Sequence, residues 1–175
     1  MQQFHPHPYQ QAGIEAILEK PGVALWMEMG LGKTVVTLTA IDQLIYDRLE
    51  ISRVLIIAPK KVAEATWQDE AAKWEHLQHL RISTVLGTEK QRKAALEAPA
   101  DIYIINRENV PCWFTHWAGA GTLTWWFWTR HPASRTRCPA VQSPQAVRPR
   151  IHKVVELTGH AKGPTACLEP LGPDS

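Results

Sequence analysis

The sequence predicts an α/β fold in which helices flank a parallel β-sheet. Two observations carry this prediction. Short apolar runs alternate with amphipathic segments through about the first 110 residues, and the helical segments are long enough to serve as right-handed crossovers between parallel strands. A glycine-containing turn at residues 27–34 also stands between an apolar run and an amphipathic segment, as in the strand-turn-helix units of α/β folds.

Each element follows from its local pattern. The first helix, residues 9–20, has Ile14, Ile17 and Leu18 on one face and is stopped by Pro21 and Gly22. Apolar runs bounded by proline or polar residues predict the strands, and helical spacing predicts the other helices. The expected strands are 22–27, 53–59, 81–86 and 101–106, and the expected helices are 33–49, 62–77 and 89–98.

The composition of the chain changes near Pro111. Residues 1–111 carry 12 Lys and Arg against 14 Asp and Glu, whereas residues 112–175 carry 7 against 3. The second part holds five of the eight tryptophans and all three cysteines. The cysteines have no CxxC spacing, so neither a zinc site nor a disulfide framework is indicated. We therefore expect the regular domain to occupy residues 1–111.

The chain shows no sign of a membrane or export segment. It contains no apolar run of eighteen residues, and its first residues have neither a basic region nor an apolar one. We expect a cytoplasmic protein with no membrane partner.

The segment from Met27 to Thr34, MEMGLGKT, has the pattern of a phosphate-binding loop. Its glycines allow backbone N–H groups to turn toward a phosphate, and the following helix presents its positive N-terminal end. Lys33 is then expected to reach the β- and γ-phosphates, and the Thr34 hydroxyl to ligate Mg²⁺. The general pattern has glycine where Met27 stands, and this sequence departs from it there. The assignment is supported by its context, because an apolar strand is expected before the loop and an amphipathic helix after it.

The ordered motifs resemble the Swi/Snf-like branch of superfamily-two helicases and DNA translocases, of DEAD/DEAH type. That family's first motif reads Asp-Glu-Met-Gly-Leu-Gly-Lys-Thr, which residues 28–34 match, with Met27 in place of the Asp. HPYQ at residues 7–10 is similar to the family's Arg-Pro-Tyr-Gln element. Residues 54–74 and 101–109 are similar to its next motifs in the same order. The resemblance implies the RecA-like P-loop domain that forms the N-terminal ATP-binding lobe, here incomplete.

The resemblance also implies roles for individual residues, with ATP and Mg²⁺ as cofactors and DNA, of double-stranded form, as partner. Gln10 would read the adenine edge. The triphosphate would be held by Met29, Gly30, Leu31, Gly32, Lys33 and Thr34, with Lys33 as the catalytic residue and Thr34 on the metal. The residues expected near DNA are Pro59, Lys60, Lys61, Asn106, Thr158 and Gly159.

Simpler structural interpretations stand beside some of these assignments. Lys60 and Lys61 are equally well explained as part of a solvated loop. Trp67 and Trp74, seven residues apart on a helix, are more typical of a core than of a platform for bases. His76 and His79 are more typical of a polar surface than of a metal site.

An ATPase of this kind needs an Asp-Glu pair at the end of an apolar strand to hold Mg²⁺ and orient water. That strand should follow residue 109 by a few tens of residues, yet no acidic residue occurs between Glu108 and Glu156. Residues 125–129, WWFWT, must be encoded TGG TGG TTY TGG ACN, because tryptophan has a single codon. Read one base upstream, the same bases force Val-Val-Leu-Asp, and the next codon can be Glu. The missing motif is thus present in another reading frame.

We therefore expect residues 112–146 to be a frameshifted, irregular segment that leaves central sheet positions unfilled. Residues 147–159 return to family-like sequence, including a strand and the Leu-Thr-Gly of the next motif, and residues 160–175 are expected to be an irregular tail. Without the acidic pair, the chain should hydrolyse little or no ATP. The second helicase lobe that the family uses is not found in these residues.

Three interpretations of function remain open. The first is the ATP-binding lobe of a DNA-dependent helicase or translocase, of bacterial or phage type and catalytically defective. The second is a nucleotide-binding module of another P-loop class, such as a small kinase, which the ordered motifs after the loop disfavour. The third is a non-catalytic interaction protein that uses its Trp-rich segment, which the hidden Val-Val-Leu-Asp disfavours.

Overall fold

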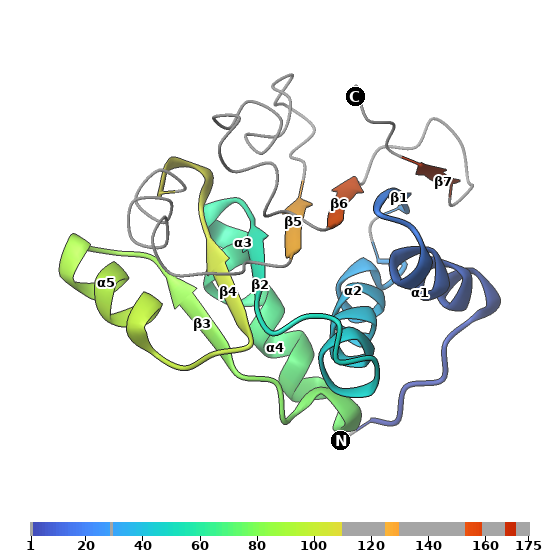
Figure 1. Cartoon of the computed structure of the whole chain (residues 1–175), viewed down its shortest axis with the longest axis horizontal. Helices are drawn as coiled ribbons and strands as arrows, with labels where there is room; N and C mark the ends of the chain where they lie inside the picture. The colour runs from blue at the N-terminus through green and yellow to red at the C-terminus, as the bar shows by residue number, and fades with distance from the viewer. Residues whose placement is uncertain (1, 29, 110–124, 130–152, 159–166, 171–175) are drawn as a thin grey trace.

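The computed structural model describes residues 2–28, 30–109, 125–129, 153–158 and 167–170 (Figure 1). Helices and strands alternate along the chain as the sequence predicted. The helices are α1 (Pro8–Glu19), α2 (Lys33–Asp42), η1 (Gln43–Asp47), α3 (Lys60–Glu64), α4 (Thr66–Lys73), η2 (Glu75–Leu77), α5 (Glu89–Glu97) and η3 (Arg107–Asn109). The strands are β1 (Gly22–Trp26), β2 (Val54–Ile57), β3 (Ile82–Val85), β4 (Ile102–Ile105), β5 (Trp125–Thr129), β6 (Lys153–Thr158) and β7 (Cys167–Pro170).

The described strands form one sheet in the order β3-β4-β2-β5-β6-β1-β7. Every neighbouring pair is parallel except β1 and β7, which run antiparallel. The predicted α/β fold with a parallel sheet is therefore confirmed. Because parallel strands end at a common edge, the loops after β1, β2 and β5 lie at the same edge of the sheet, where ligands bind in open α/β folds.

Two expected helices are interrupted. Residues 33–49 form α2 followed by a π-helical turn, η1, in place of one continuous helix. Residues 62–77 lie across α3, α4 and η2, because the chain leaves helical geometry at Ala65 (φ −139°) and at Trp74 (ψ 128°). Helical spacing alone did not reveal these breaks, since the apolar positions stay in phase on both sides of each break.

Two segments expected to be irregular contain strands. Residues 125–129 form β5, which pairs in parallel with β2 on one side and β6 on the other, so the expectation of an unfilled central position was wrong. Residues 167–170 form β7 at an edge of the sheet. In both cases the segment offers backbone groups to a neighbouring strand whose own backbone groups need partners. This is a tertiary interaction that the local sequence pattern does not predict.

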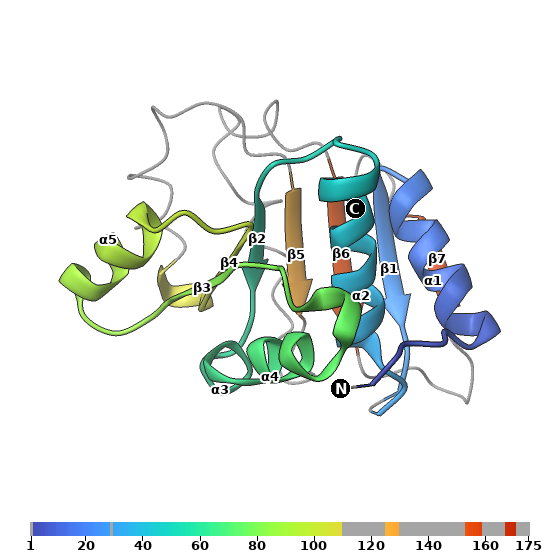
Figure 2. The same cartoon turned by 90° about the horizontal axis from the view of Figure 1, so that it is seen from below.

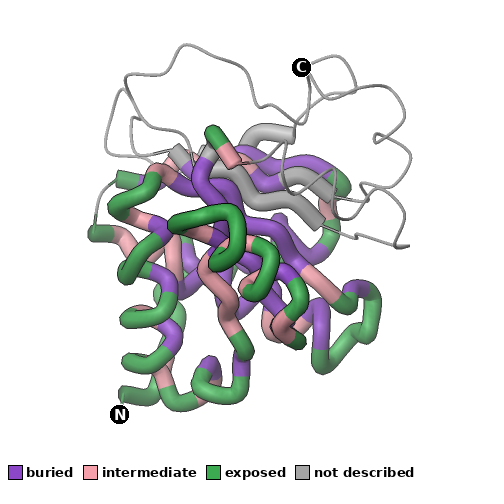
Figure 3. Tube along the Cα trace, turned by 90° about the vertical axis from the view of Figure 1, so that its left-hand side faces the viewer, coloured by how far each residue is buried: buried purple, intermediate pink, exposed green. Residues whose placement is uncertain are grey.

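Helices cover one face of the sheet, as Figure 2 shows for α1, α2 and α4. The strands facing these helices supply the buried core, in which Leu25, Ile56, Ile104 and Val155 are fully or almost fully inaccessible to solvent. The buried purple stretches of Figure 3 accordingly lie inside, with exposed residues on the outer turns of the helices. Gly13 lets α1 approach α2, because a Cβ there would lie 3.2 Å from a Val36 methyl.

A buried aspartate fixes the start of β4. Asp101 accepts hydrogen bonds from the Arg81 backbone N–H (2.9 Å), from Nε (3.1 Å) and Nη2 (2.7 Å) of the Arg81 side chain and from the Tyr46 hydroxyl (3.2 Å). Its backbone carbonyl accepts from the N–H of Val54, at the start of β2 (2.9 Å). One residue therefore joins the starts of β2 and β4 to the chain before β3.

Candidate nucleotide-binding site

The predicted phosphate-binding turn, residues 27–34, has left-handed backbone at two glycines. Gly30 has φ 89° and Gly32 has φ 78°, values that side-chain-bearing residues rarely adopt. Gly32 is the N-cap of α2, so the helix begins directly after the turn and its free N–H groups face the edge of the sheet. Met29, the remaining predicted member of this loop, lies outside the described residues.

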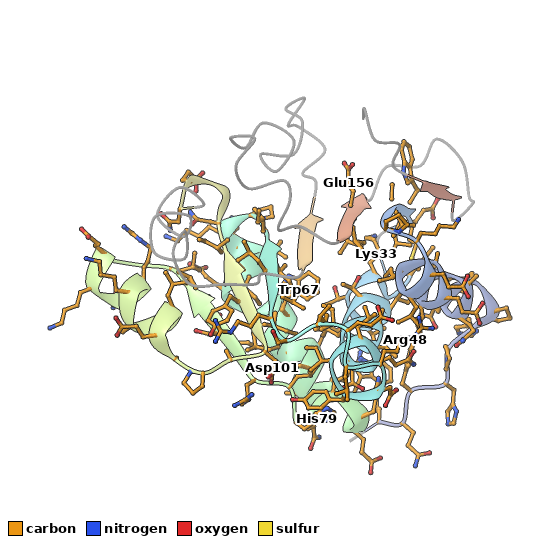
Figure 4. The ribbon with its side chains drawn as sticks, viewed as in Figure 1. Lys33, Arg48, Trp67, His79, Asp101 and Glu156 are labelled. Carbon is orange, nitrogen blue, oxygen red and sulfur yellow. The ribbon has the colours of Figure 1, made fainter. Side chains whose placement is uncertain are left out.

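Lys33 lies inside this turn. Its Nζ donates hydrogen bonds to the backbone carbonyls of Met27 and Glu28, both at 2.8 Å, and burial lowers the pKa of the ammonium. Figure 4 shows Lys33 at the start of α2. The charge is held by neutral carbonyl dipoles, so an anionic group entering the loop would offer the ammonium a stronger partner.

Gln10 connects α1 to the turn. It is buried, its Oε1 accepts from the backbone N–H of His7 (2.9 Å), and its Nε2 donates to the carbonyl of Leu31 (3.2 Å). A Cβ at Gly32 would lie only 2.7 Å from Gln10 Nε2. Glycine at position 32 is therefore required both by the backbone angle and by the close approach of this amide.

Thr34, the predicted ligand of Mg²⁺, is the second residue of α2 and is partly exposed beside Lys33. Among the described residues, no three His, Cys, Asp or Glu side chains lie close enough to bind a metal together. Mg²⁺ commonly binds proteins through one or two side chains, with the remaining positions filled by phosphate oxygens and water. The turn therefore fits Mg²⁺ only as a companion of a bound oligophosphate.

The residues predicted to lie near DNA fall at two places on the same edge. Pro59 caps α3, and the exposed Lys60 and Lys61 form its first turn, with Lys60 Nζ 3.9 Å from a Glu64 oxygen. Asn106 follows β4 directly, and the parallel pairing of β2 with β4 brings the ends of the two strands together. Its side chain is buried and donates to the Glu108 carboxylate, while its Oδ1 has no hydrogen-bond partner among the residues that the structure describes.

The other predicted residues of this edge lie near the phosphate-binding turn. Thr158 ends β6 and pairs with Trp26, the last residue of β1, while Gly159 lies outside the described residues. Thr129 ends β5 beside Leu157 of β6. Glu156, the acidic residue of β6, projects away from α2 in Figure 4, so it does not face the Lys33 side of the sheet.

Three predicted structural residues have identifiable partners. Trp67 is 1% exposed and belongs to the core, as predicted. His76 Nε2 lies 2.9 Å from the Thr39 hydroxyl, and His79 Nε2 lies 2.7 Å from a carboxylate oxygen of Asp42. Both histidines therefore join η2 and the following turn to α2.

Sequence reasoning placed His7 in the HPYQ element at residues 7–10, but it missed residues 2–6, which lead into that element, and the role of the His7 backbone. The His7 N–H holds the Gln10 side chain. The signal was present in the two prolines that flank His7, since a residue before proline is restricted to extended backbone, and His7 has φ −67° and ψ 157°.

The chain is similar to several known proteins. It is 33% identical over 170 residues to protein p41 of Acyrthosiphon pisum secondary endosymbiont phage 1, covering 91% of this chain and 36% of p41. It is 35% identical over 95 residues to helicase SWR1 of Cryptococcus neoformans var. neoformans, covering 49% of this chain and 7% of SWR1. The chain thus spans about a third of the length of p41.

Solved structures share the fold. The SWI2/SNF2 ATPase core of Sulfolobus solfataricus in complex with dsDNA superposes with a TM-score of 0.63 at 22% identity, over 92% of this chain and 35% of that one. The UvsW helicase of bacteriophage T4 superposes with a TM-score of 0.61 at 16% identity, over 89% of this chain and 53% of that one. These likenesses confirm the RecA-like helicase fold.

Within the part of the chain that the structure describes, no helix is both long and apolar enough to cross a membrane.

The sequence matches the SNF2-related domain family over residues 9–143, about three quarters of its length. With the motif order, the sheet order and the glycine turn in agreement, the chain belongs to the SNF2-related domain family.

Proposed function

We propose that this chain is the N-terminal ATP-binding lobe of a DNA-dependent translocase and that, as written, it binds ATP without hydrolysing it efficiently. The observation that carries the ATP-binding part is the turn in which Gly30 and Gly32 are left-handed and Lys33 Nζ is held by two carbonyls. An ammonium at the N-terminus of a helix, beside free backbone N–H groups, suits an oligophosphate.

Each residue of this site would make a distinct contact. Lys33 would exchange the carbonyls of Met27 and Glu28 for the β- and γ-phosphate oxygens. The Thr34 hydroxyl would hold Mg²⁺, which supplies charge neutralisation between those phosphates. Gln10, beside Gly32, would contact the adenine edge.

Double-stranded DNA is the proposed partner. Lys60, Lys61 and Asn106 lie at the edge where β2 and β4 end, which is also the edge of the phosphate-binding turn. Exposed lysines beside a helix N-terminus suit phosphodiester groups. The solved core from Sulfolobus solfataricus, whose fold this chain shares, was determined in complex with dsDNA.

The proposed defect lies at the end of β5. Two observations support position 129 as the place of the missing carboxylate. In the alternative reading frame, the forced Asp codon uses the last base of the Trp128 codon and the first two bases of the Thr129 codon. In the sheet, Thr129 ends a parallel strand that is separated from β1 by β6 alone, so its end lies on the side of the phosphate-binding turn.

The other two interpretations of function are weaker. Membership of the SNF2-related domain family disfavours a kinase-like module. An interaction surface built on the Trp-rich segment is disfavoured because Trp125, Trp126 and Trp128 belong to a strand paired on both sides.

Equilibrium binding of a fluorescent ATP analogue with Mg²⁺ tests the site. Replacing Lys33 by Ala removes the charge-assisted contact to phosphate, so affinity should fall roughly 30-fold. Lys93→Ala is the matched control, because Lys93 is an exposed lysine on α5 paired with Glu89 at 3.1 Å. Equal binding by the wild-type chain and Lys33→Ala would refute the proposed site.

An ATPase assay with and without DNA tests the defect. The wild-type chain should show little turnover in this assay. In the binding assay, the double substitution Thr129→Asp with Arg130→Glu should make nucleotide binding more dependent on Mg²⁺. DNA-stimulated turnover by the unmodified chain would show that another carboxylate performs this role. Resequencing the gene and finding no base change relative to intact relatives would sink the frameshift explanation.

A further inference from the structure

The N-terminal segment, residues 2–7, runs from the far end of α4 to the start of α1 without belonging to any regular element. At its first end Gln2 forms a parallel bridge with Trp74: its N–H donates to the Lys73 carbonyl and its carbonyl accepts from the Glu75 N–H, both at 3.2 Å. At its other end His7 holds Gln10. The segment therefore joins two places that are far apart in the sequence.

Phe4 provides the side-chain contacts at the first end. Its ring meets Trp74 edge-on with centroids 5.2 Å apart and stacks on His76 at 5.4 Å. Both partners are themselves fixed, because Trp74 Nε1 donates to Glu70 (3.0 Å) and His76 bonds to Thr39 (2.9 Å). Phe4 thus sits against a rigid surface.

Between its two ends the segment spans a hollow. A pocket of about 420 Å³ lies under residues 3–6, with its other walls formed by α1, α2, η1 and η2. His5 and Pro6, in the middle of the segment, are exposed, so the path of the segment depends on the attachments at its two ends.

The segment is also stiff. His5 and His7 each precede a proline, which restricts both residues to extended backbone, and Pro6 and Pro8 have fixed φ. Because the backbone of residues 5–8 can bend little, a displacement of Phe4 also displaces the His7 N–H. That N–H sets the orientation of the Gln10 amide, whose opposite end donates to Leu31 in the phosphate-binding turn.

We propose that residues 2–7 act as a stiff strap and that Phe4 is a positioning residue for nucleotide binding, acting through His7 and Gln10 on the adenine side of the site. This inference rests on the proposed function. It predicts that a ring lying against η2, remote from the phosphate-binding turn, governs how well the site distinguishes ATP from a ligand that has phosphates but no base.

The test measures two affinities in the presence of Mg²⁺ on the full chain: that of a fluorescent ATP analogue and, by competition, that of inorganic tripolyphosphate. Phe4→Leu keeps apolar volume but removes the ring contacts, and it should weaken the ATP analogue about threefold to tenfold while changing tripolyphosphate less. Gln10→Ala should lower the same selectivity, and the double variant should add little to the larger single effect. Phe4→Tyr, which retains the ring, should behave as the wild type.

Leu86→Ala is the matched control, because Leu86 is a partly buried residue packed against the same core but outside the strap. It should lose stability without losing selectivity, which separates positioning from general destabilisation. Unchanged selectivity in Phe4→Leu, or in Gln10→Ala, with binding still lost in Lys33→Ala, would overturn the strap while leaving the nucleotide site intact. Binding unaffected by Lys33→Ala would overturn the proposed function itself.

Discussion

β2 and β5 are neighbours in the middle of the sheet and pair residue for residue, from Val54 with Trp125 to Ile57 with Trp128. Their sequences are very different. β2 reads Val-Leu-Ile-Ile, the branched apolar composition of a parallel strand buried on both faces, whereas β5 reads Trp-Trp-Phe-Trp-Thr. A position in the sheet can therefore be filled by segments of very different side chains, because the strands pair through their backbones. The chemistry at the end of the strand still depends on the residue placed there.

The largest expected effect comes from Ile56, in the middle of β2. Ile56 is fully buried, so Ile56→Ala should lower the free energy of unfolding by about 3 kcal/mol through lost burial and the cavity left behind. Urea denaturation followed by circular dichroism measures it. The companion variant is Phe127→Ile, at the residue paired with Ile56, which should raise the unfolding midpoint because central parallel strands favour β-branched residues. A loss at Phe127→Ile as large as that at Ile56→Ala would show that β5 is packed as specifically as β2, and would contradict a frameshifted origin.

A smaller effect is expected at the start of the same strands. Asp101 joins β2 and β4 to Arg81 and Tyr46, so Asp101→Ala should cost about 2 kcal/mol by removing the hydrogen bonds that its buried carboxylate accepts. Burial raises the pKa of the Asp101 carboxyl, but hydrogen bonds from Arg81 outweigh it and hold the pKa below its usual value. The contribution is therefore present above about pH 4 and is lost as the pH falls through the folded-state pKa. Wild-type and Asp101→Asn chains whose stabilities did not converge at low pH would contradict this assignment.

The smallest effect concerns His76, on which the N-terminal strap rests. Burial lowers the pKa of His76, against the opposing field of Asp42, with His79 adding to the lowering. Because the folded-state pKa lies below the unfolded value of about 6.5, the contribution of the neutral ring is present above that pH and is lost as the pH falls through the folded-state value. Thermal melting between pH 7 and pH 5 should show a shallower decline in His76→Gln than in the wild type. Parallel curves would contradict a buried neutral imidazole.

The sequence predicted the parts of the fold whose information is local. An uninterrupted apolar run predicts each of the strands at Val54–Ile57 and Ile102–Ile105. The helical spacing of apolar residues predicts the helix that begins at Lys33. The break at Trp74 was missed because Trp74 makes tertiary contacts with Phe4 and Gln2, which lie far away in the sequence.

The candidate site divides in the same way. The glycine turn before Lys33 was predictable because such a turn is a contiguous segment with strict backbone requirements. The double anchoring of Gln10 by His7 and Leu31 was not, because it joins residues 21 apart through a buried amide. The strand at 125–129 was missed because its residues do not alternate between apolar and polar, although Trp, Phe and Thr favour strands. Its position between β2 and β6 depends on residues far away in the chain.

The order of the strands has a consequence for synthesis on the ribosome. β2, β4 and β3 are adjacent in the sheet and can pair as soon as residue 105 has emerged, but β1 cannot join them until β5 and β6 arrive to fill the gap. Until residue 158 is made, the nascent chain therefore holds its phosphate-binding loop and its three-stranded piece as separate parts of one sheet. A change of reading frame between residues 112 and 146 falls on the stretch that closes this gap. The nascent chain would then present a correctly encoded loop and a correctly encoded three-stranded piece, and only the segment that joins them would be altered.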